Sequence, residues 1–522
     1  MMSGRLSERR KILLFSLMAL GLFMSLLDVQ IVASSMGKIQ ASLAAAPDEI
    51  SWVQTAYLMS GIVMIPLSGW LSRLLSTRWL FTLSAVGFTV SSMACGFAWN
   101  IEAMVAARAI QGFVGGAMVP VAFAAGFTLF QGRSQALVPA ILGVLGTLAP
   151  TIGPTLGGWL TETLSWHWIF FINLVPGGLI SIAVPLLGRI DEPDPSLLRR
   201  CDVIGLVLLA VSLGSLEYVF EEGYRWNWFE DETIRSLAWA GTISGVFFVW
   251  RSLVHPNPLV DLRALGNRTF AVACVFNFVS GFGIFASIYI LPLFLGRVRG
   301  FNAQQIGDAV FVAGLAMVAS TPISAFLLRR IDLRLMIAFG LALFALGIGL
   351  MSAITSEWTG AELFWPQVIR GFSVMFCVVP ATNMALGSLP LAQLKMASAL
   401  FSTTRNLGGA IGIACVNTWL NDRTNFHWLR LCENLTGGRP LLGAWLDTLS
   451  GHMERVVPGP GLADPRALAT LSSLTRREAA TMAYADVLWL MAVLFFGTLI
   501  LVPLVRVPQR PAASEGQGSL SE

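Results

Sequence analysis

Residues 12–34 read ILLFSLMALGLFMSLLDVQIVAS, an apolar run with a single charged residue, Asp28. About 20 mainly apolar residues are enough for a helix to cross the hydrocarbon core of a bilayer. Arg9, Arg10 and Lys11 precede the run, as basic residues precede the core of a signal peptide. The run is too long for such a core, and no small-residue cleavage site follows it. We therefore expect a first membrane-spanning helix here.

The composition extends this interpretation to the whole chain. Apolar residues make up 55% of the 522 residues and charged residues only 12%, whereas soluble domains carry about 25% charged residues. Most of the surface must therefore face lipid. The net charge of +4 gives no reason to expect nucleic acid as a partner. The six cysteines form no CxxC pair and the four histidines lack ligand spacing, so we expect neither a disulfide framework nor a metal site.

Further apolar runs predict an all-α integral membrane protein with about 14 transmembrane helices. Their approximate bounds are 12–34, 52–72, 79–99, 103–130, 136–160, 168–188, 203–221, 234–251, 268–295, 306–328, 334–354, 364–388, 397–420 and 484–505. Loops on the cytoplasmic side of a membrane are enriched in Lys and Arg. If the N-terminus lies inside, the inner segments hold most of the basic residues. The short outer loops then hold only Lys38, Arg225, Arg235, Arg297 and Arg299. This alternation favours an even number of spans with both termini in the cytoplasm.

An internal repeat divides the chain. An offset of 256 residues aligns 66–73 with 322–329, and an offset of 262 pairs Arg108 with Arg370. Transporters are often built from repeated halves, so we predict two six-helix halves with two inserted central helices. The predicted segments are a cytoplasmic N-terminus (1–11), a first half (12–190), an inserted pair (200–255), a second half (265–505) and a disordered cytoplasmic tail (506–522).

A long outer loop at 421–483 interrupts the second half. It contains Pro458-Gly-Pro-Gly461 between two stretches that could form amphipathic helices. Two interpretations stay open for this loop: a tolerated surface insertion, or a docking surface for a partner outside the membrane.

Charged residues within the spans are candidates for function, because each costs roughly 2.5–3.5 kcal/mol at the centre of a span. Asp28 in the first span and Arg108 in the fourth lie at similar depths. If the two helices line one cavity, the guanidinium could face the carboxylate, and a proton or cation could compete for it. The alternative is a buried ion pair that only fixes helix packing.

The remaining intramembrane charges are less specific. Arg370 and Arg405 could bind anionic groups or hold helices through backbone carbonyls, while Glu217 lies on an inserted helix, where a structural role is favoured. The run 143–158, GVLGTLAPTIGPTLGG, combines prolines that favour kinks with glycines that allow close helix approach. Such a helix could bend and slide as a transporter changes conformation.

Together these residues resemble the major facilitator superfamily, and within it the 14-span drug:proton antiporters of the EmrB/QacA type. Residues 27–32, LDVQIV, resemble the first-helix motif LDxTIV, with Gln30 in place of threonine. Residues 108–112, RAIQG, match the motif RxxQG and include Gln111. The exporter motif GPxxGG is matched by Gly153, Pro154, Gly157 and Gly158.

Two other motifs depart from the family pattern. Residues 166–178, WHWIFFINLVPGG, resemble WRWIFxINxPxG, with His167 replacing the arginine. The loop 69–78 lacks the acidic residue of GxLxDRxGRR, which belongs to a charge latch at the inner face of these proteins.

The resemblance implies a major facilitator fold and a proton-coupled antiporter that exports small lipophilic or amphipathic compounds by alternating access. Such multidrug efflux confers antibiotic resistance. Asp28 would carry the proton and Arg108 would couple to it, while Gln30, Gln111, Arg370, Arg405 and Glu217 are possible substrate or coupling residues. No cofactor is implied, since the proton gradient supplies the energy. The location would be the inner membrane, and a periplasmic adaptor and outer-membrane channel are possible partners.

Three alternatives were weighed against this function. A dedicated exporter of one metabolite, fatty acid or siderophore fits the same features. A proton-coupled importer is disfavoured by GPxxGG. A multi-span membrane enzyme is disfavoured further, because no loop clusters acids or histidines as a catalytic site would.

Overall fold

The computed structural model describes residues 7–46, 49–130, 134–135, 137–187, 190–328, 330–387, 389–390, 393–435, 440–456 and 463–504. Within these ranges the regular structure is entirely helical. The first helices are α1 (Glu8–Leu43), α2 (Trp52–Leu75), α3 (Thr77–Gly96), α4 (Ile101–Gly115), α5 (Met118–Leu129), α6 (Leu137–Thr163), α7 (Trp168–Phe171) and α8 (Leu174–Leu187). Then come η2 (Pro195–Arg200), α9 (Val203–Glu222), η3 (Trp228–Glu230), α10 (Glu232–Val254) and η4 (Leu262–Gly266). The last are α11 (Arg268–Arg297), α12 (Ala303–Leu327), α13 (Leu333–Met351), α14 (Gly360–Leu386), α15 (Leu394–Asn434), α16 (Pro440–Val456), α17 (Ala463–Gly497) and η5 (Thr498–Leu504).

Thirteen segments of the described chain are long and apolar enough to cross a membrane. The predicted span at 103–130 is divided into α4 and α5, and the span at 168–188 into α7 and α8. The predicted span at 397–420 is the one not among these thirteen; it lies in α15, where Arg405 and Asn406 interrupt the apolar sequence and lower its hydropathy. The prediction of an all-α, multi-pass membrane protein is confirmed.

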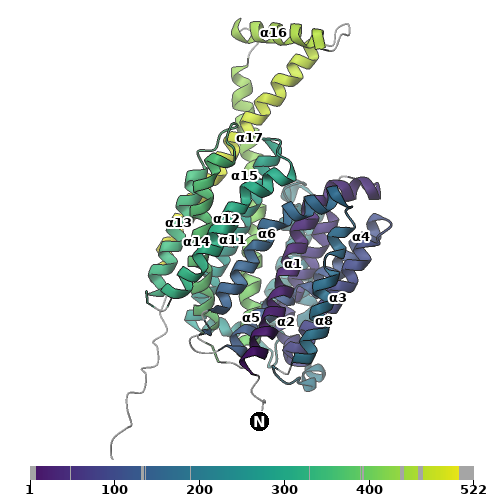
Figure 1. Cartoon of the computed structure of the whole chain (residues 1–522), viewed down its shortest axis with the longest axis vertical. Helices are drawn as coiled ribbons and strands as arrows, with labels where there is room; N and C mark the ends of the chain where they lie inside the picture. The colour runs from purple at the N-terminus through teal and green to yellow at the C-terminus, as the bar shows by residue number, and fades with distance from the viewer. Residues whose placement is uncertain are drawn as a thin grey trace, which may run out of the picture.

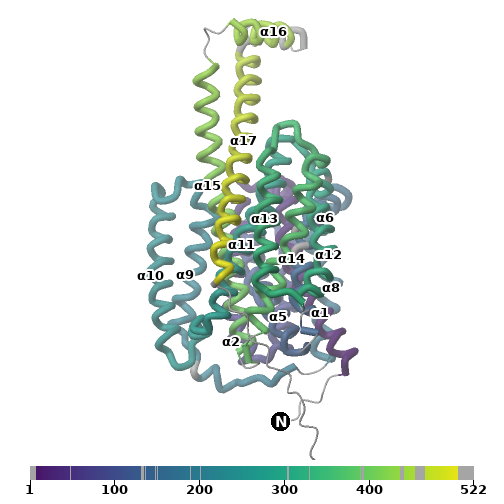
Figure 2. Tube along the Cα trace, turned by 90° about the vertical axis from the view of Figure 1, so that its left-hand side faces the viewer, coloured from purple at the N-terminus to yellow at the C-terminus, as the bar shows by residue number. Residues whose placement is uncertain are grey.

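The helices form two groups that lie side by side (Figure 1). In the first group α1 packs on α6 and α4 packs on α2 and α3; in the second α11 packs on α15 and α14 packs on α12 and α13. Helices α9 and α10 pack on each other at the outside of the bundle, with α9 against α2 and α15 (Figure 2). Each group is therefore built from helices of one half of the chain, and the pair α9–α10 forms a separate element between them in sequence.

A helical hairpin projects from one end of the bundle. Helices α15 and α17 continue beyond the other helices, and α16 lies across their tip (Figures 1 and 2). Residues 421–434 contain neither Gly nor Pro, so nothing in the sequence ends the α15 helix where its apolar part ends. Most of the predicted loop 421–483 is therefore helix, although Pro458–Gly461 and the tail 506–522 lie outside the described residues. We call this end of the bundle the hairpin end and the other, where α1 begins, the opposite end.

Candidate functional site: a buried ion pair between α1 and α4

Asp28 on α1 and Arg108 on α4 form an ion pair inside the first group of helices. Arg108 Nη1 donates to Asp28 Oδ2 over 2.5 Å, and both side chains are fully buried. The matched depths predicted from the sequence thus place the two residues together. A pair without solvent on either side interacts far more strongly than one at a surface, because water does not screen it.

Two amides hold the other carboxylate oxygen of Asp28. Asn173 Nδ2 donates to Asp28 Oδ1 over 2.8 Å, and Gln111 Nε2 donates to the same atom over 3.2 Å. Asn173 lies in the break between α7 and α8 and also donates to Ser92 Oγ on α3, at 3.0 Å. The break in the predicted span at 168–188 therefore delivers a polar side chain to the carboxylate.

Arg108 is held from three sides. Its Nε donates to the Val53 carbonyl over 3.1 Å, and its Nη1 also donates to Gln111 Oε1 over 2.6 Å. The guanidinium carbon lies 4.2 Å from the centre of the Tyr57 ring, a cation–π contact. Its Nη2 is buried without a hydrogen-bond partner among the described residues. A buried donor without an acceptor is costly, so the arrangement is not fully satisfied.

This geometry supports a charge switch. A proton on Asp28 would neutralise the carboxylate and leave the Arg108 charge buried without its counter-ion, which is strongly unfavourable. The network would then have to rearrange or admit another anionic group. The alternative interpretation is that the ion pair only fixes helix packing, in which case no rearrangement would be needed.

Helix α6, which carries the GPxxGG residues, approaches α1 closely. A Cβ added at Gly153 would lie 2.4 Å from Gln30 Cβ, and one at Gly157 would lie 2.7 Å from the Ile31 carbonyl. Ser35 Oγ lies 3.4 Å from the Gly157 carbonyl. Pro154 and Gly158 are half-buried. Glycines 153 and 157 therefore set the distance between α6 and the helix of Asp28.

Another face of α6 contacts the second group. A Cβ added at Gly314 of α12 would lie 2.8 Å from Thr151, and one at Gly307 would overlap Thr155. Small residues thus bring the two groups together in the part of the bundle nearer the hairpin. Because α6 contacts α1 on one side and α12 on the other, it links the ion pair to the interface between the groups.

An ion pair joins the groups at the opposite end, and the sequence did not reveal it. Lys395 at the start of α15 pairs with Asp191, which follows α8. Asp191 also accepts from the Thr77 backbone N–H over 3.0 Å, and Lys395 Nζ donates to the Ser72 carbonyl over 2.8 Å. Asp191 therefore places an acid beside the loop 69–78, whose own motif lacks one.

The two predicted intramembrane arginines of the second group, Arg370 and Arg405, have no acid partner among the described residues. Arg370 donates to Ser287 Oγ over 2.8 Å and to Gln367 Oε1 over 2.7 Å, while its Nε is buried without a partner. Arg405 Nε donates to Asn277 Oδ1 over 3.0 Å, and its Nη2 is likewise unpartnered. Neither shares a hydrogen bond with the Asp28 network, so the structure does not bring all predicted site residues together.

Two other predicted or altered positions lie apart from the ion pair. Glu217 is buried on α9, with Oε2 unpartnered among the described residues. His167 stacks on Trp166 at 3.8 Å between ring centres, and burial lowers its pKa. At neutral pH this histidine is therefore uncharged, where the family has an arginine.

A polytopic helical bundle with a charged pair sealed between its helices defines the class of membrane transporters. Comparison with known proteins makes this specific. The profile of the Major Facilitator Superfamily matches residues 18–413. The colistin resistance protein EmrB of Acinetobacter baumannii is 37% identical over 94% of this chain and 95% of its own length. The multidrug export protein EmrB of Escherichia coli K12 is 28% identical over 96% of both.

A solved structure agrees with the fold. The human organic anion transporter MFSD10 superposes with a TM-score of 0.58 at 16% identity, covering 94% of this chain and 99% of that one. The chain belongs to the major facilitator superfamily, with the EmrB-type exporters among its relatives, and it is a transporter.

Proposed function

We propose that the protein is a proton-coupled antiporter that exports small lipophilic or amphipathic compounds by alternating access of its two groups of helices. The buried pair Asp28–Arg108 carries the proposal, because it is a single protonatable carboxylate held by three donors within the bilayer region. The multidrug and colistin resistance names of the relatives support export as the direction of transport. The inward proton gradient would supply the energy.

The second group of helices supports an anionic or neutral substrate. Arg370 is buried and Arg405 is partly buried with its Nη2 buried, and neither has an acid partner among the described residues. A guanidinium left uncompensated in a membrane interior favours an arriving anionic or neutral hydrogen-bond-accepting group. This observation also supports the narrower candidate, a dedicated exporter of one lipophilic acid such as a fatty acid.

Reconstituted vesicles test the coupling. Purified protein in proteoliposomes, with a lumenal pH dye, should move protons when a lipophilic substrate is added, and Asp28→Asn should abolish this movement. Asp28→Glu, which keeps the carboxylate, should retain part of it. Substrate-driven proton movement that persists in Asp28→Asn would remove Asp28 from the coupling role. A response to lipophilic acids alone, across a panel of dyes and acids, would select the narrower candidate.

The hairpin suits a partner beyond the membrane. From the distribution of Lys and Arg, we propose that the hairpin end faces the periplasm and that both termini lie on the cytoplasmic side of the inner membrane. Helix α16 and the projecting arms of α15 and α17 would then dock a periplasmic adaptor that leads to an outer-membrane channel. Removal of residues 436–462 should leave transport in inverted vesicles intact but abolish drug resistance in cells. Full resistance in cells carrying the deletion would argue against the adaptor.

A further inference from the structure

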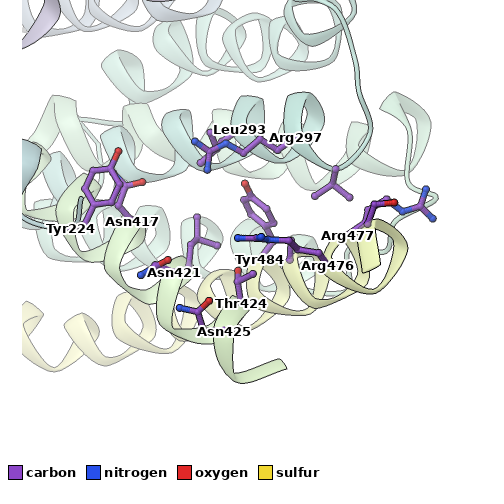
Figure 3. Close-up of a pocket in the computed structure, with 14 residues that line it drawn as sticks. Tyr224, Leu293, Arg297, Asn417, Asn421, Thr424, Asn425, Arg476, Arg477 and Tyr484 are labelled. Atoms are coloured by element: carbon purple, nitrogen blue, oxygen red, sulfur yellow. The ribbon is translucent and has the colours of Figure 1, made fainter. Parts of the chain in front are cut away.

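A pocket lies where the hairpin leaves the bundle, well separated in the fold from the ion pair on α1 and α4. Its volume is about 450 Å³, and it is bordered by the end of α11, by the middle parts of α15 and α17, and by Tyr224 after α9. Figure 3 shows its lining residues. None of the described lining residues is acidic, whereas three are arginines: Arg297, Arg476 and Arg477.

Two of these arginines are free to bind a ligand. Arg297 on α11 and Arg476 on α17 are exposed, and neither has a hydrogen bond or ion pair among the described residues. Arg477 differs, since it contacts Glu478 at 3.1 Å and Glu357 at 3.8 Å. In Figure 3 Arg297 and Arg476 approach the pocket from opposite walls, and Arg477 extends away from them. Two unpaired guanidinium groups across one hollow form a site for an anion.

The rest of the lining combines apolar and polar side chains. The Tyr484 ring is almost fully buried and packs edge-on against Phe294, 5.3 Å between centres. Leu293 and Leu420 add apolar surface, while Asn421 and Asn425 supply amides further along α15. This combination of apolar surface with two unpaired arginines fits an amphiphile that has an anionic head and an apolar tail, rather than a compact hydrophilic anion.

The level of the pocket indicates the source of such a head. Arg297 follows the predicted span that ends near residue 295, and Tyr484 begins the last predicted span. Tyrosines are enriched at the membrane–water interface, and basic residues there attract anionic lipids. The pocket therefore lies at the level of lipid headgroups on the hairpin side.

We propose that this pocket binds the phosphate head of an anionic phospholipid, with Arg297 and Arg476 as its ligands. The bound lipid would contact the base of the hairpin, where Asp486 already joins α17 to Arg423 and His427 of α15. It would thus brace both arms of the hairpin at the membrane surface. The site depends on neither proton coupling nor the exported compound.

A lipid-binding measurement tests the proposal. The full chain, purified in detergent, is titrated with phosphatidylglycerol that carries a fluorophore on its acyl chain. Unlabelled phosphatidylglycerol, phosphatidylcholine and sodium phosphate are the competitors. The double variant Arg297→Ala/Arg476→Ala should bind at least about tenfold more weakly, and Arg297→Lys/Arg476→Lys should recover part of the affinity. Arg430→Ala is the matched control, because Arg430 is an exposed arginine of α15 that lies outside the pocket and pairs with Glu433. It should bind like the unaltered protein.

The possible results separate the sources of the anion. Equal binding by the double alanine variant and the unaltered protein would overturn the proposal, as would displacement by phosphatidylcholine as effective as that by unlabelled phosphatidylglycerol. Displacement by millimolar sodium phosphate would replace the lipid by a soluble anion as the occupant. Thermal melting of each variant shows whether lost binding reflects lost folding.

Discussion

At the scale of single residues, the main feature is the number of side chains that donate hydrogen bonds to one carboxylate. Asp28 accepts from Arg108, Asn173 and Gln111, which lie on α4 and in the α7–α8 break. A purely structural ion pair needs only the guanidinium and one or two backbone donors. The two amide donors occupy the second oxygen of the carboxylate and fix its position. Their loss should therefore affect coupling more than folding.

Asn173→Ala removes the shorter of the two amide bonds to Asp28. A hydrogen bond to a charged group contributes about 1.5–3 kcal/mol, so we expect substrate-driven proton flux in proteoliposomes to fall by roughly tenfold or more. Ser92→Ala is the control, since it removes the 3.0 Å bond that supports Asn173 and the bond from Ser92 Oγ to the Phe170 carbonyl but leaves every donor to Asp28 in place. It should have a smaller effect. Unchanged flux in Asn173→Ala, with the protein folded, would show that Asp28 functions without this donor.

At the scale of elements, α6 determines how closely the ion-pair helix α1 approaches the rest of the bundle. Its glycines lie against α1, and its threonines lie against glycines of α12. Without side chains at these points the helices pack through their backbones, and small relative movements need no rotamer change. The exporter motif is thus a contact surface in this structure rather than a set of ligand-binding groups.

Two glycines of α6 that face α1 provide a matched pair of variants. A Cβ at Gly157 would lie 2.3 Å from Ser34 Oγ, whereas one at Gly146 would come no closer than 3.8 Å to Leu26. We expect Gly157→Ala to destabilise the protein by about 1–3 kcal/mol through overpacking, seen as a lower melting temperature and slower transport. Gly146→Ala should be tolerated, because alanine also favours a helix more than glycine does. Equal melting temperatures for the two variants would contradict the packing role.

At the scale of the whole molecule, the sequence predicts what depends on local pattern. Length and hydropathy predict the spans, and the position of Asp28 and Arg108 within their spans predicts their shared depth. The sequence does not predict partners that a helix break or a distant loop delivers. Asn173 lies within an apolar run, and the charge pair Lys395–Asp191 joins residues 204 positions apart. In the sequence, Lys395 is explained equally well as a basic residue on the cytoplasmic side. The sequence predicts a span only at 397–420 and not the continuation of α15 to Asn434, because the residues after 420 are mostly polar.

The same pair suggests how the opposite end of the bundle stays closed. Lys395 reaches from the second group to Asp191 and to the Ser72 carbonyl of the first group. Gly69 lies against Met396 beside it, with 3.0 Å from an added Cβ to the Met396 Cα. Contacts also join the groups toward the hairpin end through α6 and α12, so the structure has the two groups closed on each other at both ends. Opening of the opposite end must break the Lys395 contacts.

Lys395→Ala should therefore favour an open opposite end. Both side chains of the pair are about one-fifth exposed, so solvent weakens the interaction to about 1 kcal/mol, a roughly fivefold change in the ratio of open to closed molecules. Nitroxide labels, introduced as unnatural amino acids at the exposed Trp79 and Leu335, leave the six native cysteines unaltered and report the distance between α3 and α13. We expect the longer-distance population to rise in Lys395→Ala and to stay near the level of the unaltered protein in Lys395→Arg. It should also rise in the unaltered protein at high salt, because salt screens the pair. A distance distribution that neither the variant nor salt changes would show that other contacts keep this end closed.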